Sequence, residues 1–184
     1  MRDLFTAAAL ATLIASGAGA TGLKIEVAGQ ANGTVTIDLF EDVAPLHVAR
    51  ITELAAAGAY DGVVFHRVIE GFMAQTGDVQ FGKEGDEAGL AGTGDSGQPD
   101  LKAEFSDIPY EKGTVGMGRK RSNDSANSQF FIMFDAAPHL NGQYTVVGRV
   151  TEGQDVVDAI KLGDPRSGQI DGAPDVMRTV TVTD

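Results

Sequence analysis

The stretch FHRVIEGFMAQTGD, which runs from Phe65 to Asp78, places one arginine among valine, isoleucine, phenylalanine and methionine side chains. Arginine is rarely buried without a partner, and it cannot lose its charge. Arg67 therefore needs an explanation. It is either the partner of some carboxylate in a structural ion pair, or a cation that is held ready for use in an apolar setting.

The same stretch predicts a β-hairpin. Val63–Ile69 and Phe72–Thr76 have the composition of strands, and Glu70-Gly71 supplies the turn between them. Because side chains alternate along a strand, the first strand should direct three residues to one face, and the second should lie beside them. The predicted result is an apolar dish on the outside of a sheet, with a guanidinium and an amide at its rim, built from Phe65, Arg67, Ile69, Phe72, Met73 and Gln75.

The rest of the chain repeats this strand pattern. Alternating or β-rich segments separated by turn residues predict six further strands, over Leu23–Ala28, Gly33–Phe40, Thr114–Gly118, Gln129–Phe134, Thr145–Val150 and Val176–Thr183. Two segments have helical spacing: one begins at Pro45 and ends at Gly58, and the other spans Thr151–Gly163. Eight strands with two helices predict a mainly β protein, a closed eight-stranded antiparallel barrel capped by two α-helices, because closure removes exposed sheet edges.

Composition restricts the function classes. The formal charge is −12 over 184 residues, which argues against a nucleic-acid partner, and there is no basic cluster that would hold the chain on a membrane. We expect a monomer. There is no cysteine for disulfides, and no motif for a metal or another cofactor is present.

The first twenty residues resemble an export signal. Leu4–Ile14 is almost wholly apolar, and Ala18-Gly19-Ala20 has the small-residue pattern of a signal-peptidase site. The alternative is a buried first helix. We expect residues 1–20 to be a cleaved signal peptide, residues 21–184 to form one domain, and the mature protein to reside in the bacterial periplasm.

A long acidic, glycine-rich segment, Gly82–Asp100, contains a Gly-x-Gly-x-x-Gly match at Gly92–Gly97. This match neither follows a clear strand nor opens a helix, so it does not predict a dinucleotide site. We expect a solvated surface loop. The three histidines are scattered, and His47 is expected on the surface of the first helix. No local motif for a catalytic triad is present, although distant residues could assemble one in space.

Three long segments resemble the cyclophilin family of peptidyl-prolyl cis-trans isomerases. They are YDGVVFHRVIEGFMAQTGD (Tyr60–Asp78), GTVGMGRKRSNDSANSQFFIMF (Gly113–Phe134) and HLNGQYTVVGRV (His139–Val150). The resemblance covers nearly all of residues 21–184. It implies an eight-stranded barrel with two helices, an isomerase activity, and proline-containing segments of unfolded or folding proteins as substrates.

The resemblance also implies the site. Arg67 falls on the family's catalytic arginine and Gln75 on its glutamine. Substrate-binding positions fall on Phe65, Phe72, Met73, Gly118, Arg119, Gln129, Phe131, His139, Leu140 and Tyr144. Gly118-Arg119 resembles a bacterial variant of this pair, His139 replaces a tryptophan that is common in eukaryotic members, and Tyr144 replaces a histidine.

The chemistry of proline rotation accounts for a cation in an apolar setting. Rotation about a peptide bond faces a barrier of about 18–20 kcal/mol, and the twisted amide nitrogen gains a lone pair. A donor that binds this twisted state more tightly than the planar one lowers the barrier. Arg67 is predicted to be that donor. The competing hypothesis is a binding module, in which the dish captures proline segments without turnover.

Overall fold

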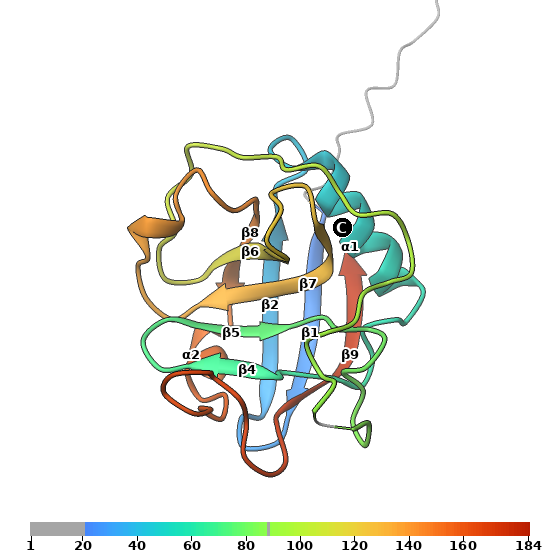
Figure 1. Ribbon diagram of the computed structural model, residues 1–184, viewed down its shortest axis with the longest axis vertical. Coiled ribbons are helices and arrows are strands. Elements are labelled where there is room, and N and C mark those ends of the chain that lie inside the picture. The colour runs from blue at the N-terminus through green and yellow to red at the C-terminus, as the bar shows by residue number, and fades with distance from the viewer. Residues whose placement is uncertain (1–20, 88) are drawn as a thin grey trace, which may run out of the picture.

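The protein is described by a computed structural model over residues 21–87 and 89–184 (Figure 1), and the signal peptide predicted for residues 1–20 lies outside them. The described residues form two α-helices, a short 3-10 helix and nine strands. The helices are α1 (Pro45–Ala56), α2 (Gln154–Asp158) and η1 (Pro138–Leu140). The strands are β1 (Gly22–Ala28), β2 (Gly33–Leu39), β3 (Val63–Val64), β4 (Arg67–Ile69), β5 (Met73–Thr76), β6 (Thr114–Arg119), β7 (Ala126–Met133), β8 (Val146–Glu152) and β9 (Val176–Thr183).

All nine strands belong to one antiparallel sheet in the order β3-β9-β1-β2-β8-β6-β7-β5-β4. The sheet curls over itself, so that β4, β5 and β7 cross in front of β2 in Figure 1. The mainly β architecture is confirmed, but the closed eight-stranded barrel is wrong in detail. The two outermost strands, β3 and β4, are consecutive in the chain and each pairs with a different neighbour.

The ninth strand arises because the predicted strand Val63–Ile69 is split at Phe65 and His66. Val63 pairs with Met177 of β9, whereas Arg67 pairs with Gln75 of β5. The side-chain alternation therefore restarts after the break. Phe65 turns into the main core, where it is only 1% exposed, and does not lie beside Arg67. Its prediction as a substrate-binding residue is wrong for this reason.

The two helices cover different ends of the curled sheet, α1 at the upper right and α2 at the lower left of Figure 1. The helix α1 begins at Pro45, as predicted, because proline suits the first helical turn. Its apolar stripe, which includes Val48, Ile51 and Leu54, is buried. The helix α2 is only five residues long, much shorter than predicted. Within residues 21–87 and 89–184, no helix is long and apolar enough to cross a membrane.

The expectation that His47 lies on the surface is wrong, because its side chain is fully buried. Its Nδ1 lies 2.6 Å from Glu104, and the same carboxylate accepts hydrogen bonds from the backbone N–H groups of Leu46 and His47. Glu104 thus satisfies free donors at the first turn of α1 and attaches the segment after the acidic loop to that helix. An anchor from a residue so distant in sequence leaves no local pattern.

Candidate active site

The predicted dish is present in part on the outer face of the sheet, since Phe65 and Ile69 do not line it. A cavity of about 180 Å³ brings together residues from four separate segments: Arg67, Phe72, Met73, Gln75, Gly118, Arg119, Phe131, Leu140 and Tyr144. The hairpin pairing of β4 with β5 sets Arg67 opposite Gln75 and Ile69 opposite Met73, as the turn at Glu70-Gly71 predicts. Nine of the predicted site residues therefore line one cavity, and Gln129 and His139 lie at its edges.

Arg67 is held by neutral oxygens. Its Nε donates to the carbonyl of Ser167 at 3.1 Å, and its Nη1 donates to Oε1 of Gln75 at 3.2 Å. In the described part of the chain no carboxylate lies within salt-bridge distance of it. Burial lowers the pKa of the Arg67 guanidinium, yet arginine remains protonated at physiological pH. The cation therefore retains an uncompensated charge at the cavity, which argues against a structural ion pair.

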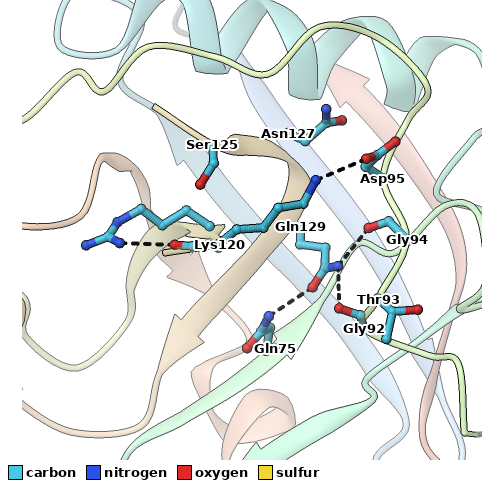
Figure 2. A pocket seen from close by; sticks show the side chains of 11 residues that line it. Gln75, Gly92, Thr93, Gly94, Asp95, Lys120, Ser125, Asn127 and Gln129 are labelled. Carbon is cyan, nitrogen blue, oxygen red and sulfur yellow. Dashed lines mark hydrogen bonds and ion pairs between the residues drawn. The ribbon is translucent and has the colours of Figure 1, made fainter. Parts of the chain in front are cut away.

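A relay of amides fixes the orientation of Gln75. Its Nε2 donates to Oε1 of Gln129 at 2.9 Å, which leaves its own Oε1 to face Arg67. Gln129 in turn donates from Nε2 to the carbonyls of Gly92 and Gly94, at 3.0 and 2.9 Å (Figure 2). These two carbonyls can only accept hydrogen bonds, so they require the NH₂ group of Gln129 to face them and its oxygen to face Gln75. Gln75 must then turn its NH₂ group toward Gln129 and its oxygen toward Arg67.

The glycine-rich loop is therefore part of the site, and the expectation of a solvated surface loop is wrong for this part of it. Asp78, which is fully buried, accepts hydrogen bonds from the backbone N–H groups of Gly92 and Gly94 through Oδ2, and from those of Gln80 and Phe81 through Oδ1. One carboxylate thus holds both the loop and the turn after β5. The Gly-x-Gly pattern at Gly92–Gly94 is the one local signal for this loop, but without a strand before it or a helix after it the pattern predicts no particular contact.

Aromatic side chains form the wall of the cavity. Tyr144 makes an edge contact with Phe131, with ring centroids 6.0 Å apart, and the guanidinium carbon of Arg119 lies 4.3 Å from the centre of the Tyr144 ring. Tyr110 stacks behind Phe131 with centroids 5.8 Å apart. It was not predicted as a site residue. Its buried ring supports the wall without touching the cavity, so neither charge nor a known motif singles it out.

His139 lies at the rim, on η1. Its ring stacks on Phe72 with centroids 5.7 Å apart and an interplanar angle of 30°. His139 is exposed, whereas Leu140, the next residue, is buried in the smaller core cluster beneath the cavity. The imidazole therefore extends the apolar surface of the dish at one edge.

A second depression adjoins the first across Gln75, Gly118 and Arg119. It has a volume of about 180 Å³ and is lined in part by Thr93, Asp95, Lys120 and Ser125. Figure 2 shows Lys120 reaching across it to Asp95, with Nζ 3.4 Å from Oδ2. The described residues hold no cluster of three histidine, cysteine or carboxylate side chains that could bind a metal.

Comparison with known proteins agrees with this geometry. The family model described as "Cyclophilin type peptidyl-prolyl cis-trans isomerase/CLD" matches residues 23–183. The chain belongs to the cyclophilin family. This cyclophilin is accordingly an enzyme, a peptidyl-prolyl cis-trans isomerase.

Its relatives include bacterial proteins of similar length. It is 55% identical over 153 residues to a probable peptidyl-prolyl cis-trans isomerase of Brucella suis. The aligned region covers 82% of this chain and 78% of that protein. It is 39% identical over 136 residues to a peptidyl-prolyl cis-trans isomerase of Helicobacter pylori, and the aligned region covers 72% of this chain and 77% of that protein.

Solved structures share the fold. The cyclophilin AquaCyp293 from Hirschia baltica superposes with a TM-score of 0.71 at 26% identity, over 87% of this chain and 73% of that one. A cyclophilin type isomerase of Cryptosporidium parvum, determined in the presence of the dipeptide Ala-Pro, superposes with a TM-score of 0.72 at 22% identity, over 89% and 99%.

Proposed function

We propose that this cyclophilin accelerates rotation about X-Pro bonds by stabilising the twisted prolyl amide with Arg67. The observation that carries the proposal is the position of this guanidinium at an apolar cavity, held by the carbonyl of Ser167 and the amide of Gln75, with no carboxylate of residues 21–87 and 89–184 within salt-bridge distance. Such a donor gains most from a nitrogen whose lone pair has been released by twisting, and this differential binding is what lowers a barrier.

The apolar wall and floor have a separate role in the proposal. Phe72, Met73, Phe131 and Leu140 would hold the proline ring while the chain on the other side of the bond rotates. They would also keep water away from the guanidinium, which strengthens its interaction with the amide nitrogen. No bond of the substrate breaks and no proton leaves it, so the mechanism requires neither a general base nor a metal.

The alternative candidate is a module that binds proline segments without turnover. A pure binder needs the apolar cavity but gains nothing from an oriented guanidinium. The relay from Gly92 and Gly94 through Gln129 and Gln75 to Arg67 therefore favours catalysis.

Replacing Arg67 by alanine should lower kcat/KM for a short X-Pro peptide by at least about 10-fold, because hydrogen bonds to charged groups contribute about 1.5–3 kcal/mol. Lysine at the same position keeps the charge but loses the planar fork, and should recover only part of the rate. The measurement is a coupled isomerisation assay on residues 21–184. Arg149→Ala, which removes a half-buried arginine paired with Glu111, is the matched control. An Arg67→Ala enzyme as fast as the parent would contradict the mechanism.

A second expectation concerns inhibitors. Cyclosporin-type cyclic peptides should bind more weakly here than to cyclophilins with tryptophan at the position of His139, because an indole offers a larger apolar face and a fixed N–H donor. The change His139→Trp should tighten binding about 30-fold, the equivalent of about 2 kcal/mol. Titration calorimetry on both proteins, with isomerase rates measured in parallel, tests this. Equal inhibitor affinities would show that His139 does not occupy the inhibitor contact.

We also propose that the enzyme acts on exported proteins in the periplasm. Support comes from the apolar run Leu4–Ile14 and the small residues Ala18-Gly19-Ala20. N-terminal sequencing of the protein from its native host should find Thr21 first, in the fraction outside the cytoplasm. Cytosolic protein that retains Met1–Ala20 would contradict export and leave the isomerase mechanism untouched.

A further inference from the structure

A separate cavity of about 210 Å³ lies outside the proline site, between the acidic loop and the segment before β9. Most of its side chains are apolar: Val64, Phe81, Ala91, Ile170, Ala173 and Pro174. These residues come from three separate parts of the chain, which the fold brings to one place. The proposed chemistry at Arg67 does not use this cavity.

A groove that shares lining residues with both connects the cavity to the proline site. A shallow groove of about 320 Å³ has Arg67 and Gln75 in its lining, and these two residues also line the proline cavity. The groove shares His66, Ala91 and Gln169 with the second cavity. An extended polypeptide that crosses Arg67 can therefore run along the groove to the second cavity, advancing about 3.3 Å per residue.

The chemistry of the lining favours an apolar occupant. His66 lies beneath Gly92, and burial lowers the pKa of its imidazole to about 4, so the shared floor is uncharged at neutral pH. The charged groups at the rim already have partners. Lys83 donates from Nζ to the carbonyls of Ala59 and Asp61, Glu84 pairs with Arg178, and Asp86 accepts from the backbone N–H of Lys83.

We propose that this cavity receives one large aliphatic side chain, such as leucine, from the same polypeptide substrate, a few residues away from the proline. The inference rests on the proposed function, since the groove leads to the cavity only from a peptide held at Arg67. The cavity then acts as a specificity subsite. It selects X-Pro bonds that lie near a hydrophobic residue, which are the segments that an unfolded chain exposes.

The first test uses a blocked peptide with one proline and four alanines on each side, in which each alanine in turn is replaced by leucine. Leucine at one of these positions should raise kcat/KM of the parent enzyme by about 10-fold, because the larger side chain moves from water into the apolar cavity. Ala173→Trp, at an exposed position that lines this cavity but not the groove, should abolish that gain. Its rate on the all-alanine peptide should equal the parent's.

The matched control is Ala49→Trp, which adds the same bulk to the exposed face of α1 and should retain the leucine gain. A gain at no position, or one that survives in Ala173→Trp, would overturn the subsite while leaving isomerisation of the all-alanine peptide intact. If the parent fails on the all-alanine peptide and on every leucine peptide, the proposed function itself is wrong and the subsite falls with it.

A second measurement requires no variant that fills the cavity. In methyl NMR spectra of the parent, assigned with Ile170→Val, the leucine peptide should shift the Ile170 methyl signal, and the all-alanine peptide should not. Equal shifts with both peptides would contradict the proposal. A shift on raising the protein concentration alone would identify a second copy of the chain as the occupant and overturn it.

Discussion

Replacing Asp78 by alanine is expected to lower the free energy of unfolding by about 4 kcal/mol and to abolish most isomerase activity. The change leaves four backbone N–H groups without their acceptor, and each buried donor left unpaired costs about 1–3 kcal/mol. Activity should fall because Gly92 and Gly94 hold Gln129, which orients Gln75 beside Arg67. Urea unfolding and the peptide assay measure the two effects.

Asp78→Asn sharpens this test. The amide keeps one acceptor oxygen but turns an NH₂ group toward two of the four donors, so most of the loss should remain. Asp107→Ala, at an exposed position, is the matched control and should change stability by no more than about 0.5 kcal/mol. A stable Asp78→Asn protein with normal activity would show that charge and acceptor number at this position are unimportant.

Acid should destabilise the protein through His66. Burial, opposed by nearby Asp78 and reinforced by Arg67, lowers the pKa of this imidazole from an ordinary 6.5 to about 4. The unfolded chain therefore binds a proton at a higher pH than the folded one. The stability contributed by neutral His66 is complete above about pH 6.5 and is lost as the pH falls toward 4, a change of about 3 kcal/mol.

The measurement is the free energy of unfolding at several pH values for the parent and for His66→Gln, which cannot titrate. Between pH 7 and pH 4, the free energy of unfolding of the parent should fall by about 3 kcal/mol more than that of His66→Gln. His139→Gln removes an exposed histidine but keeps His66, so it should retain the loss of stability at acid pH. If the curves of the parent and His66→Gln run parallel, His66 is not the titrating group.

Local patterns were sufficient to predict the hairpin and the four cavity residues that it carries, and the resemblance to a family supplied the other five. Alternation and the turn at Glu70-Gly71 set Arg67 opposite Gln75, and helical spacing starting at Pro45 identified α1. The failures share one physical cause. Phe65 is drawn into the core because its strand splits between the hairpin partner β5 and the distant strand β9, and a pairing partner as far along the chain as β9 leaves no trace in local sequence.

The same reasoning applies to polar contacts. The carboxylates of Asp78 and Glu104 look like ordinary surface charges in the sequence, but each is committed to backbone donors that the fold brings to it. The site was predictable where neighbours in sequence build it, and where the resemblance to a family supplies residue positions. The role of the loop that orients Gln75 was not predictable. Its contacts depend on the carboxylate of Asp78, more than ten residues away, and on backbone carbonyl groups, which every residue carries.

The position of β9 has a consequence for how the chain is made. This strand is the last of the nine along the described residues, yet it lies inside the sheet between β1 and β3, and Gly22 pairs with Thr183. A chain still growing on the ribosome has β1 early, but that strand lacks one of its two neighbours until β9 has been made. The first strand therefore keeps an unpaired edge until every other strand of the sheet has been synthesised.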